Sequence, residues 1–349
     1  MRTLGLDGML LDASGMVSRP PETLRIVALG GGTGLPVVLR GLKRALFPRD
    51  ASWHPRRDAT RLTGVVTVAD DGGSSGRLRR ACGMIAPGDL RNCLLALADG
   101  DPRTAALFDF RFNGASDISG HSLGNLILTA LCELERGVGE AVTRAGEILN
   151  IRGQIVPSTA ANVTLLAEFD DGRCVTGESN IAIVRRAIRR VRLLPSGAPG
   201  LPSALEAVAA ADLVVLGPGS LYTSVLPVLL VEDVARAIVG SRARVALVSN
   251  VMTEPGETDG YTAADFVRAI RRHVPDLAIH DVVVNTAPVP PTVRARYASD
   301  GSFRVSGDAA SLTALGCRPV ERDLIGAGPE IRHDPDKLAR VLLELLNEV

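Results

Sequence analysis

Residues 25–46 read RIVALGGGTGLPVVLRGLKRAL, and this stretch decides the expected fold. Residues 25–30 are apolar apart from Arg25 and predict a buried strand. Glycines then predict a tight turn, and apolar residues recur with helical spacing from Leu35 to about Leu46. A buried strand, a glycine-rich turn and an amphipathic helix form the first half of a βαβ unit, the building block of a parallel sheet.

Strand and helix patterns alternate in the same way further along the chain. Short apolar runs predict strands at residues 64–68, 212–216, 244–248 and 281–284. Periodic apolar residues predict helices at residues 90–98, 123–134, 138–149, 231–239, 262–274 and from Pro335 onward. Asp89 is expected to cap the helix at 90–98, and Ser203 with Glu206 predicts a capping box. The alternation predicts an α/β fold, a Rossmann-like three-layer sandwich with a mainly parallel sheet.

The domain organisation is expected to be simple. Residues 1–23 are predicted to be a flexible leader, and residues 24–349 a single α/β domain. A helical insertion at about residues 85–150 is expected to form a cap over one end of the sheet. Asp171-Gly172, between apolar runs at 163–169 and 173–176, predicts a hairpin.

The composition excludes several classes of protein. Lys plus Arg and Asp plus Glu number 39 each, so the net charge is zero and a general nucleic-acid binder is not expected. Aromatic residues make up only 3%, which leaves few side chains for base stacking. The five cysteines form no Cys-x-x-Cys pair, which is typical of a reducing cytosol. Asp7 and Asp12 lie where a signal peptide is apolar, so we expect a cytoplasmic protein.

One stretch approaches the length of a membrane span. Residues 213–231 contain no charge over 19 positions. Gly217-Pro218-Gly219 and Pro227 interrupt any helix there and would leave backbone groups unsatisfied in lipid. We therefore expect a buried strand, a turn and a new element, and no membrane span.

The glycine-rich turn after the first strand is a candidate anion site. Ligands of parallel sheets bind beyond the carboxyl ends of the strands, where glycines and a helix N-terminus favour phosphate. We expect Gly31, Gly32, Thr33 and Gly34 to bind an anion; the alternative is a tight turn without a ligand. No Gly-Lys-Ser/Thr follows, which excludes a P-loop, and Leu35 occupies the third glycine position of G-x-G-x-x-G, which disfavours an NAD site.

Residues 70–77 form the second candidate, a loop by composition. The adjacent carboxylates of Asp70 and Asp71 suit a divalent cation such as Mg²⁺. Ser74 and Ser75 supply hydroxyls, and Arg77 supplies positive charge for an anion. A solvated surface turn is the alternative.

The third candidate loop follows the strand at 212–216. Its small and hydroxyl residues are expected to hold the phosphate or base of a nucleotide, with a plain turn as the alternative; they are Gly217, Gly219, Ser220, Thr223 and Ser224. Asn250 follows another strand and is expected to read a base edge, and Arg332 is expected to reach a phosphate. His121 is a candidate acid, base or phosphate ligand, with a capping or packing role as the alternative.

Several segments resemble one known family in the same order. They are GGGTGLP at 30–36, VADDGGSSGRLR at 68–79, PGDLRNCLL at 87–95, HSLGN at 121–125, GESNI at 177–181, GPGSLYTSVLP at 217–227 and NVMTEPGETD at 250–259. The chain resembles the bacterial gluconeogenesis factors of the YvcK type, within the superfamily of 2-phospho-L-lactate transferase (CofD-like). The resemblance covers the chain from about Leu24 onward.

The resemblance implies a Rossmann-like fold with a helical cap in a cytoplasmic protein. It implies binding of a UDP-sugar, chiefly UDP-N-acetylglucosamine, and a role in cell shape and cell-wall precursor supply during gluconeogenic growth, with cell-wall or cell-shape proteins as partners. The transferase relatives instead join phospholactate to a deazaflavin, with a guanosine nucleotide donor and Mg²⁺.

The resemblance also implies roles for individual residues. It places Gly31, Gly32 and Thr33 on the phosphate-contacting turn, and residues 217–224 on the nucleotide loop. It places Asp70 and Asp71 at the metal site of the transferases and Arg332 at the nucleotide-sugar site. Pro335 occupies the place of a phosphorylated threonine in some relatives, so that control is expected to be absent.

Two functions of different classes follow. One is a UDP-sugar-binding regulator that turns nothing over, since no nucleophile–base pair stands out in the sequence. The other is a Mg²⁺-dependent transferase of a phosphorylated small acid. A third interpretation, an α/β scaffold whose loops bind nothing, ranks below these two. The apolar helices are compatible with packing within one chain or across a homo-oligomer.

Overall fold

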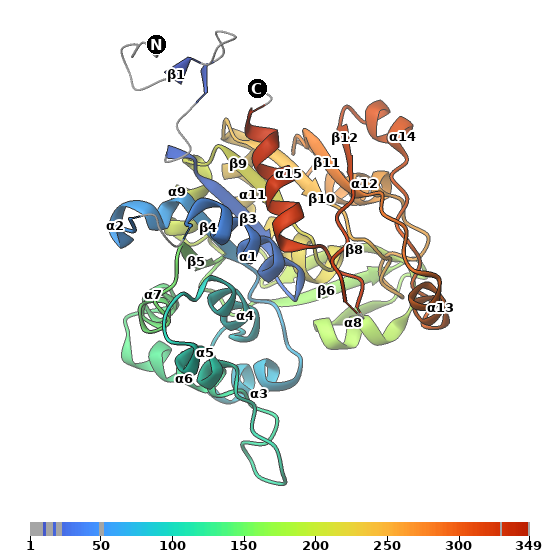
Figure 1. Cartoon of the computed structure of the whole chain (residues 1–349). Coiled ribbons are helices and arrows are strands. Elements are labelled where there is room, and N and C mark those ends of the chain that lie inside the picture. The colour runs from blue at the N-terminus through green and yellow to red at the C-terminus, as the bar shows by residue number, and fades with distance from the viewer. Residues whose placement is uncertain (1–9, 12–16, 19–22, 49–51, 329, 348–349) are drawn as a thin grey trace.

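The computed structural model describes residues 10–11, 17–18, 23–48, 52–328 and 330–347. A seven-stranded sheet forms its centre (Figure 1), in the order β12-β11-β10-β9-β3-β4-β5, with every neighbouring pair parallel. The strands are β3 (Ile26–Gly30), β4 (Leu62–Val66), β5 (Gln154–Pro157), β9 (Leu213–Leu216), β10 (Arg244–Val248), β11 (Asp281–Asn285) and β12 (Arg318–Arg322). β3, β4, β9 and β11 are buried along their whole length because helices cover the sheet on both faces, whereas the edge strand β12 is mostly exposed.

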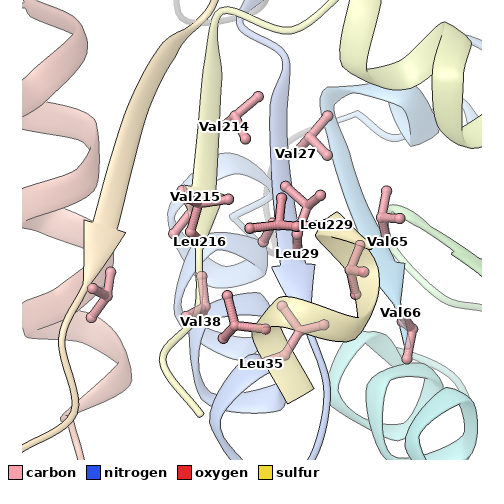
Figure 2. Close-up of a cluster of buried hydrophobic side chains, with 14 of the residues drawn as sticks. Val27, Leu29, Leu35, Val38, Val65, Val66, Val214, Val215, Leu216 and Leu229 are labelled. Carbon is pink, nitrogen blue, oxygen red and sulfur yellow. The ribbon is translucent and has the colours of Figure 1, made fainter. Parts of the chain in front are cut away.

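Helices on the two faces complete three layers. α1 (Gly34–Leu46) and α15 (Pro335–Asn347) pack against each other in front of the sheet in Figure 1. α10 (Leu226–Leu229) contacts β3, and in Figure 2 it crosses in front of the strands while α1 lies behind them. Leu29, Leu35 and Leu229 belong to one buried core. The expected Rossmann-like three-layer fold is confirmed.

Further helices connect the strands or lie beside them. They are α2 (Pro55–Asp58), η2 (Ala59–Arg61), α8 (Glu178–Val184), α9 (Pro202–Ala209), the π-helical turn η3 (Leu221–Val225), α11 (Glu232–Gly240), α12 (Ala263–His273), α13 (Pro291–Ser299) and α14 (Ala309–Ala314).

A group of helices occupies the segment at about residues 85–150 where a cap is expected. It contains α4 (Gly88–Leu97), α5 (Pro102–Asp109), α6 (Leu123–Leu134) and α7 (Val138–Ile148). α3 (Gly73–Cys82) precedes this segment and packs against α6. Figure 1 shows them together at one end of the sheet. The domain boundaries themselves stay a prediction.

Two small antiparallel sheets lie outside the central one. β7 (Cys174–Thr176), β6 (Thr164–Phe169) and β8 (Ile188–Leu194) form a three-stranded sheet in the order β7-β6-β8, which contains the expected hairpin. β1 (Leu10–Leu11) pairs with β2 (Val17–Ser18). The rest of the expected leader, apart from Thr23, lies outside the described residues.

Three local predictions are wrong. The segment 70–77 is not a loop throughout, because α3 begins at Gly73 and buries Ser74, Ser75 and Leu78. The composition of a turn is overridden here by packing, since α3 contacts α6. The helix at residues 202–209 begins with a proline at its first position and has no side-chain cap, so no capping box forms at its start. α4 begins at Gly88, which places Asp89 in the first turn rather than at the cap.

The uncharged stretch at 213–231 is divided between β9, a turn, η3 and α10. Within the described part of the chain, no helix has the length and apolar character needed to cross a membrane.

Candidate functional site

The loops after neighbouring strands meet at one rim of the sheet. β10, β9, β3 and β4 are consecutive and parallel, so their carboxyl ends lie side by side. A Cβ on Gly34 would lie 2.2 Å from the carbonyl oxygen of Pro218, and one on Gly32 would lie 3.2 Å from Oγ of Ser224. The Gly219 N–H donates to Oδ1 of Asn250 over 3.0 Å. Three of the predicted ligand segments are therefore in direct contact.

The glycine loop presents the free end of a helix. Thr33 precedes α1 and its side chain makes no capping hydrogen bond. The N–H of Leu35 donates to the carbonyl oxygen of Gly31 over 3.4 Å and Pro36 has no N–H, so the N–H of Gly34 is the group in the first turn of α1 that is left for an anion. Gly32 has a φ of +59°, a left-handed conformation that favours glycine, and Gly34 approaches the neighbouring loop too closely for any side chain.

A cavity of about 360 Å³ opens beside this helix end. Its lining comes from the β3–α1 loop, the loop after β9, residues 250–255, the region of α13 and residues 331–333. Of the predicted ligand residues, the lining includes Thr33, Gly34, Gly219, Asn250 and Arg332. The structure thus joins five segments that are far apart in the sequence into one concave site.

The two polar residues predicted at this cavity are already engaged within the protein. Asn250 accepts from Gly219 and donates from Nδ2 to Oε1 of Glu254 over 3.3 Å, so its amide holds two loops together. Arg332 has a half-exposed side chain and forms a 2.5 Å ion pair with Glu330. An anionic ligand would therefore compete with Glu330 for the guanidinium of Arg332.

The hydroxyl residues of the third loop are divided between the cavity edge and the interior. Thr223 is buried and donates to Oε1 of Glu257 over 3.3 Å, and the side chain of Ser220 hydrogen-bonds to Glu254. Ser224 is buried beside Gly32. These side chains shape the rim, and direct ligand contact by them stays a prediction.

The predicted residues on α3 lie elsewhere, against the cap. Ser74 is buried, lies 2.9 Å from Nδ1 of His121 and accepts a hydrogen bond from Nδ2 of Asn125 over 3.0 Å. Arg77 donates to the carbonyl oxygen of Ser119 over 2.5 Å. None of these residues, nor Ser75, lines the rim cavity. The sequence pattern did not reveal the contact between Ser74 and His121, which are far apart along the chain.

The two carboxylates of the predicted metal pair accept hydrogen bonds from different segments of the structure. Oδ1 of Asp70 accepts from the N–H of Gly72 over 2.8 Å. Oδ1 of Asp71 accepts from the N–H and the hydroxyl of Ser179, at 2.9 and 2.7 Å, and so holds the first turn of α8. Among the residues that the structure describes, no group of three or more His, Cys, Asp or Glu side chains is arranged to hold a metal. Binding of Mg²⁺ by Asp70 and Asp71 stays a prediction.

A set of buried acids, which the sequence pattern did not single out, lies behind the glycine loop. Burial raises the pKa of Asp89 to about 7, although the Gly32 N–H donates to this carboxyl. Burial, together with the charges of Asp70, Asp89 and Glu257, raises the pKa of Glu178 to about 9. Burial and the charge of Glu254 raise the pKa of Glu257 to about 8. At neutral pH several of these carboxyls are therefore protonated or share protons.

Glu178→Gln is expected to flatten the alkaline decline in stability. A carboxyl with a pKa of about 4.3 in the unfolded chain and about 9 when folded favours folding below pH 4, and that contribution is lost as the pH rises toward 9. The free energy of unfolding of the variant should exceed that of the wild type by roughly 2–4 kcal/mol at pH 9 and by little at pH 5. This range allows for partial exposure of the side chain. Urea unfolding at the two pH values measures this, with Glu206→Gln on an exposed helix position as the control. If the free energies of unfolding of wild type and Glu178→Gln depend on pH in the same way, the raised pKa of Glu178 is contradicted.

Together, a parallel sheet covered by helices on both faces and a cavity at the carboxyl ends of its strands define an α/β protein of the doubly wound class. A family model described as 2-phospho-L-lactate transferase CofD matches residues 26–325, and the chain belongs to this CofD family. It is 42% identical over 325 residues to the gluconeogenesis factor of Bacillus subtilis, which covers 93% of this chain and 98% of that relative. It is 41% identical over 323 residues to the gluconeogenesis factor of Listeria innocua, covering 92% and 95%.

A solved structure agrees with this assignment. The crystal structure of a UPF0052 family member from Bacillus halodurans superposes with a TM-score of 0.85 at 41% identity, covering 92% of this chain and 99% of that one. The resemblance to gluconeogenesis factors within the CofD-like superfamily is confirmed.

Proposed function

We propose that this protein binds a UDP-sugar, UDP-N-acetylglucosamine in the first place, at the rim cavity and acts as a regulator without turning the ligand over. The observation that carries the proposal is the meeting of Thr33, Gly34, Gly219 and Arg332 at one cavity. Backbone N–H groups at the start of α1 suit the diphosphate, and Arg332 suits its charge. The curated relatives bear the name gluconeogenesis factor, which supports a role in metabolism rather than in nucleic-acid binding.

The wider role follows from the same proposal. A sensor of a cell-wall precursor in the cytoplasm would adjust cell shape and precursor supply during growth on gluconeogenic carbon, through protein partners that respond to the bound state. The ligand would act by binding one of two states of the protein more tightly than the other, and so would shift the equilibrium toward that state.

A Mg²⁺-dependent transferase of a phosphorylated small acid is the second candidate. The buried acids around Asp89 and Glu178 favour it, because a cation would stabilise their charged forms. Asp70 lies within electrostatic reach of both carboxyls, whereas Asp71 is held by Ser179. In this case Mg²⁺ would neutralise charge on the transferring group.

Calorimetry with UDP-N-acetylglucosamine, with and without Mg²⁺, separates the two functions. Binding without Mg²⁺ and recovery of intact ligand after long incubation support the regulator. Release of UMP or of a phosphosugar supports a transferase, and Asp70→Asn should then remove the Mg²⁺ dependence. Absence of binding under both conditions would contradict the proposal.

Arg332→Ala is expected to weaken UDP-sugar binding by about tenfold, or about 1.4 kcal/mol. The loss is at the low end for a charged contact because the phosphate must displace Glu330 from the guanidinium, which is already half exposed. The dissociation constant from calorimetry measures the effect. Arg340→Ala, on an exposed position of α15, is the matched control and should bind as the wild type does. An unchanged constant for Arg332→Ala would remove this residue from the site.

A further inference from the structure

The rim cavity contains two buried polar atoms without a hydrogen-bond partner. Nε2 of His333 and Oε2 of Glu254 are both shielded from solvent and unpaired, and both side chains line the cavity. His333 is only 7% exposed. An unpaired buried polar atom is unfavourable, and most such groups in folded proteins have a partner. Each of the two atoms therefore marks a position where an atom of a ligand would complete a hydrogen bond.

Both side chains are held in place by the rest of the protein. Oε1 of Glu254 accepts from Nδ2 of Asn250 over 3.3 Å, and its backbone N–H donates to Oγ1 of Thr258 over 2.8 Å. The backbone of His333 forms an antiparallel bridge with Ile325. The unpaired atoms are thus preorganised, so that little order has to be created when a ligand binds.

Burial also sets the charge of the histidine. It lowers the pKa of His333 to about 4, so the ring is neutral at pH 7 and carries one N–H and one bare nitrogen. Burial raises the pKa of Glu254, an effect that the hydrogen bond from Ser220 opposes. The pair can therefore present one donor and one acceptor to the same ligand.

The wall beside these atoms is apolar. Val251, Met252 and Ile331 form a small buried cluster with Tyr297 packed against it, and all four line the cavity. An apolar wall beside two polar groups suits a heterocyclic base better than a sugar, whose hydroxyl groups point in several directions. A volume of about 360 Å³ is enough for a nucleoside.

We propose that Glu254 and His333 determine base specificity by reading the imide edge of uracil. Oε2 of Glu254 accepts from N3–H of the base, and Nε2–H of His333 donates to a neighbouring carbonyl oxygen. The diphosphate then lies toward Thr33 and Gly34 at the other end of the cavity. This inference rests on the proposed binding of a UDP-sugar and adds the groups that select the base.

The test compares UDP with 3-methyl-UDP, in which a methyl group replaces the N3 proton. Wild-type protein is expected to bind UDP at least about tenfold more tightly in calorimetry, the difference that one hydrogen bond to a charged group produces. Glu254→Met should bring this ratio close to one, because it removes the acceptor of N3–H. His333→Phe should weaken the binding of UDP and 3-methyl-UDP by the same factor, because the carbonyl oxygen that accepts from His333 is present in both. His333→Gln should keep the affinity for both ligands, because the side-chain amide of glutamine can place an N–H where the ring carries Nε2–H.

The ratio of the affinities for UDP and 3-methyl-UDP, rather than the affinity for UDP alone, distinguishes recognition of the base from a structural role. Glu330→Gln, at the rim beside Arg332, should change the affinities for UDP and 3-methyl-UDP by the same factor. If the wild type binds UDP-N-acetylglucosamine but shows no preference for UDP over its 3-methyl form, the inference is overturned while the proposed function stands. A preference that survives in folded Glu254→Met also overturns it, and so does an unchanged affinity for UDP in folded His333→Phe. A wild type that binds neither UDP nor UDP-N-acetylglucosamine overturns the proposed function itself.

Discussion

Gly34→Ala is expected to lower the affinity for a UDP-sugar by about a hundredfold. A Cβ at this position would lie 2.2 Å from the carbonyl oxygen and 2.5 Å from the carbonyl carbon of Pro218, and backbone atoms cannot step aside as a flexible side chain can. The two loops must therefore separate. Losing two hydrogen bonds to a diphosphate, at about 1.5 kcal/mol each, corresponds to roughly that factor. Calorimetry with UDP-N-acetylglucosamine measures it.

The matched control is Gly240→Ala. Gly240 ends α11, and a Cβ there would meet no atom within 4 Å, so binding and stability should be unchanged. Circular dichroism and thermal unfolding of Gly34→Ala establish that the variant is folded. Wild-type affinity in a folded Gly34→Ala protein would show that the two loops do not jointly bind the ligand.

Asp281→Ala is expected to lower the free energy of unfolding by about 3 kcal/mol. Asp281 is fully buried at the start of β11, with hydrogen bonds to Nη2 of Arg244 at 2.9 Å and Nε of Arg318 at 2.6 Å. Arg244 is mostly buried, so removal of the carboxylate leaves its charge poorly compensated inside the protein. Urea unfolding at pH 7 measures the loss.

The same ion-pair group predicts a pH dependence. Burial alone would raise the pKa of Asp281, but hydrogen bonds and charges from Arg244 and Arg318 outweigh it and hold the pKa below its ordinary value. The carboxylate therefore stabilises the fold above about pH 4, its unfolded pKa, and this contribution is lost as the pH falls below that value. The difference between wild type and Asp281→Ala should shrink toward pH 3. Asp276→Ala, at an exposed position, should match the wild type at every pH.

The two groups of predicted site residues have different places in the molecule. Thr33, Gly34, Gly219 and Arg332 line the rim cavity, whereas Ser74 and Arg77 lie against the cap. A ligand at the rim would contact the first group directly. One direct connection between the glycine loop and the cap is the hydrogen bond that Asp89 of α4 accepts from the Gly32 N–H.

Much of the fold was predictable because helices and strands carry their signals locally. The apolar run at residues 244–248 predicts β10 to the residue, and the periodicity at 123–134 predicts α6 to the residue. The loop expected at residues 70–77 failed because a composition rich in Gly and Ser also fits the first turns of a helix once that helix is buried.

The sequence by itself predicted β3, β4, β9, β10 and β11 and the glycine-rich loops that follow β3, β4 and β9, and thus the rim at which a ligand is expected; it did not predict β5 and β12. Only the tertiary structure decided that Asp71 turns away to hold α8, that Glu178 lies within electrostatic reach of Asp89 and Glu257, and that His333 and Glu254 face one cavity. The reason is the range of the interactions. Helix and strand periodicity depends on residues two to four positions apart, whereas burial, shifted pKa values and unpaired atoms depend on segments that meet only when the whole chain has packed.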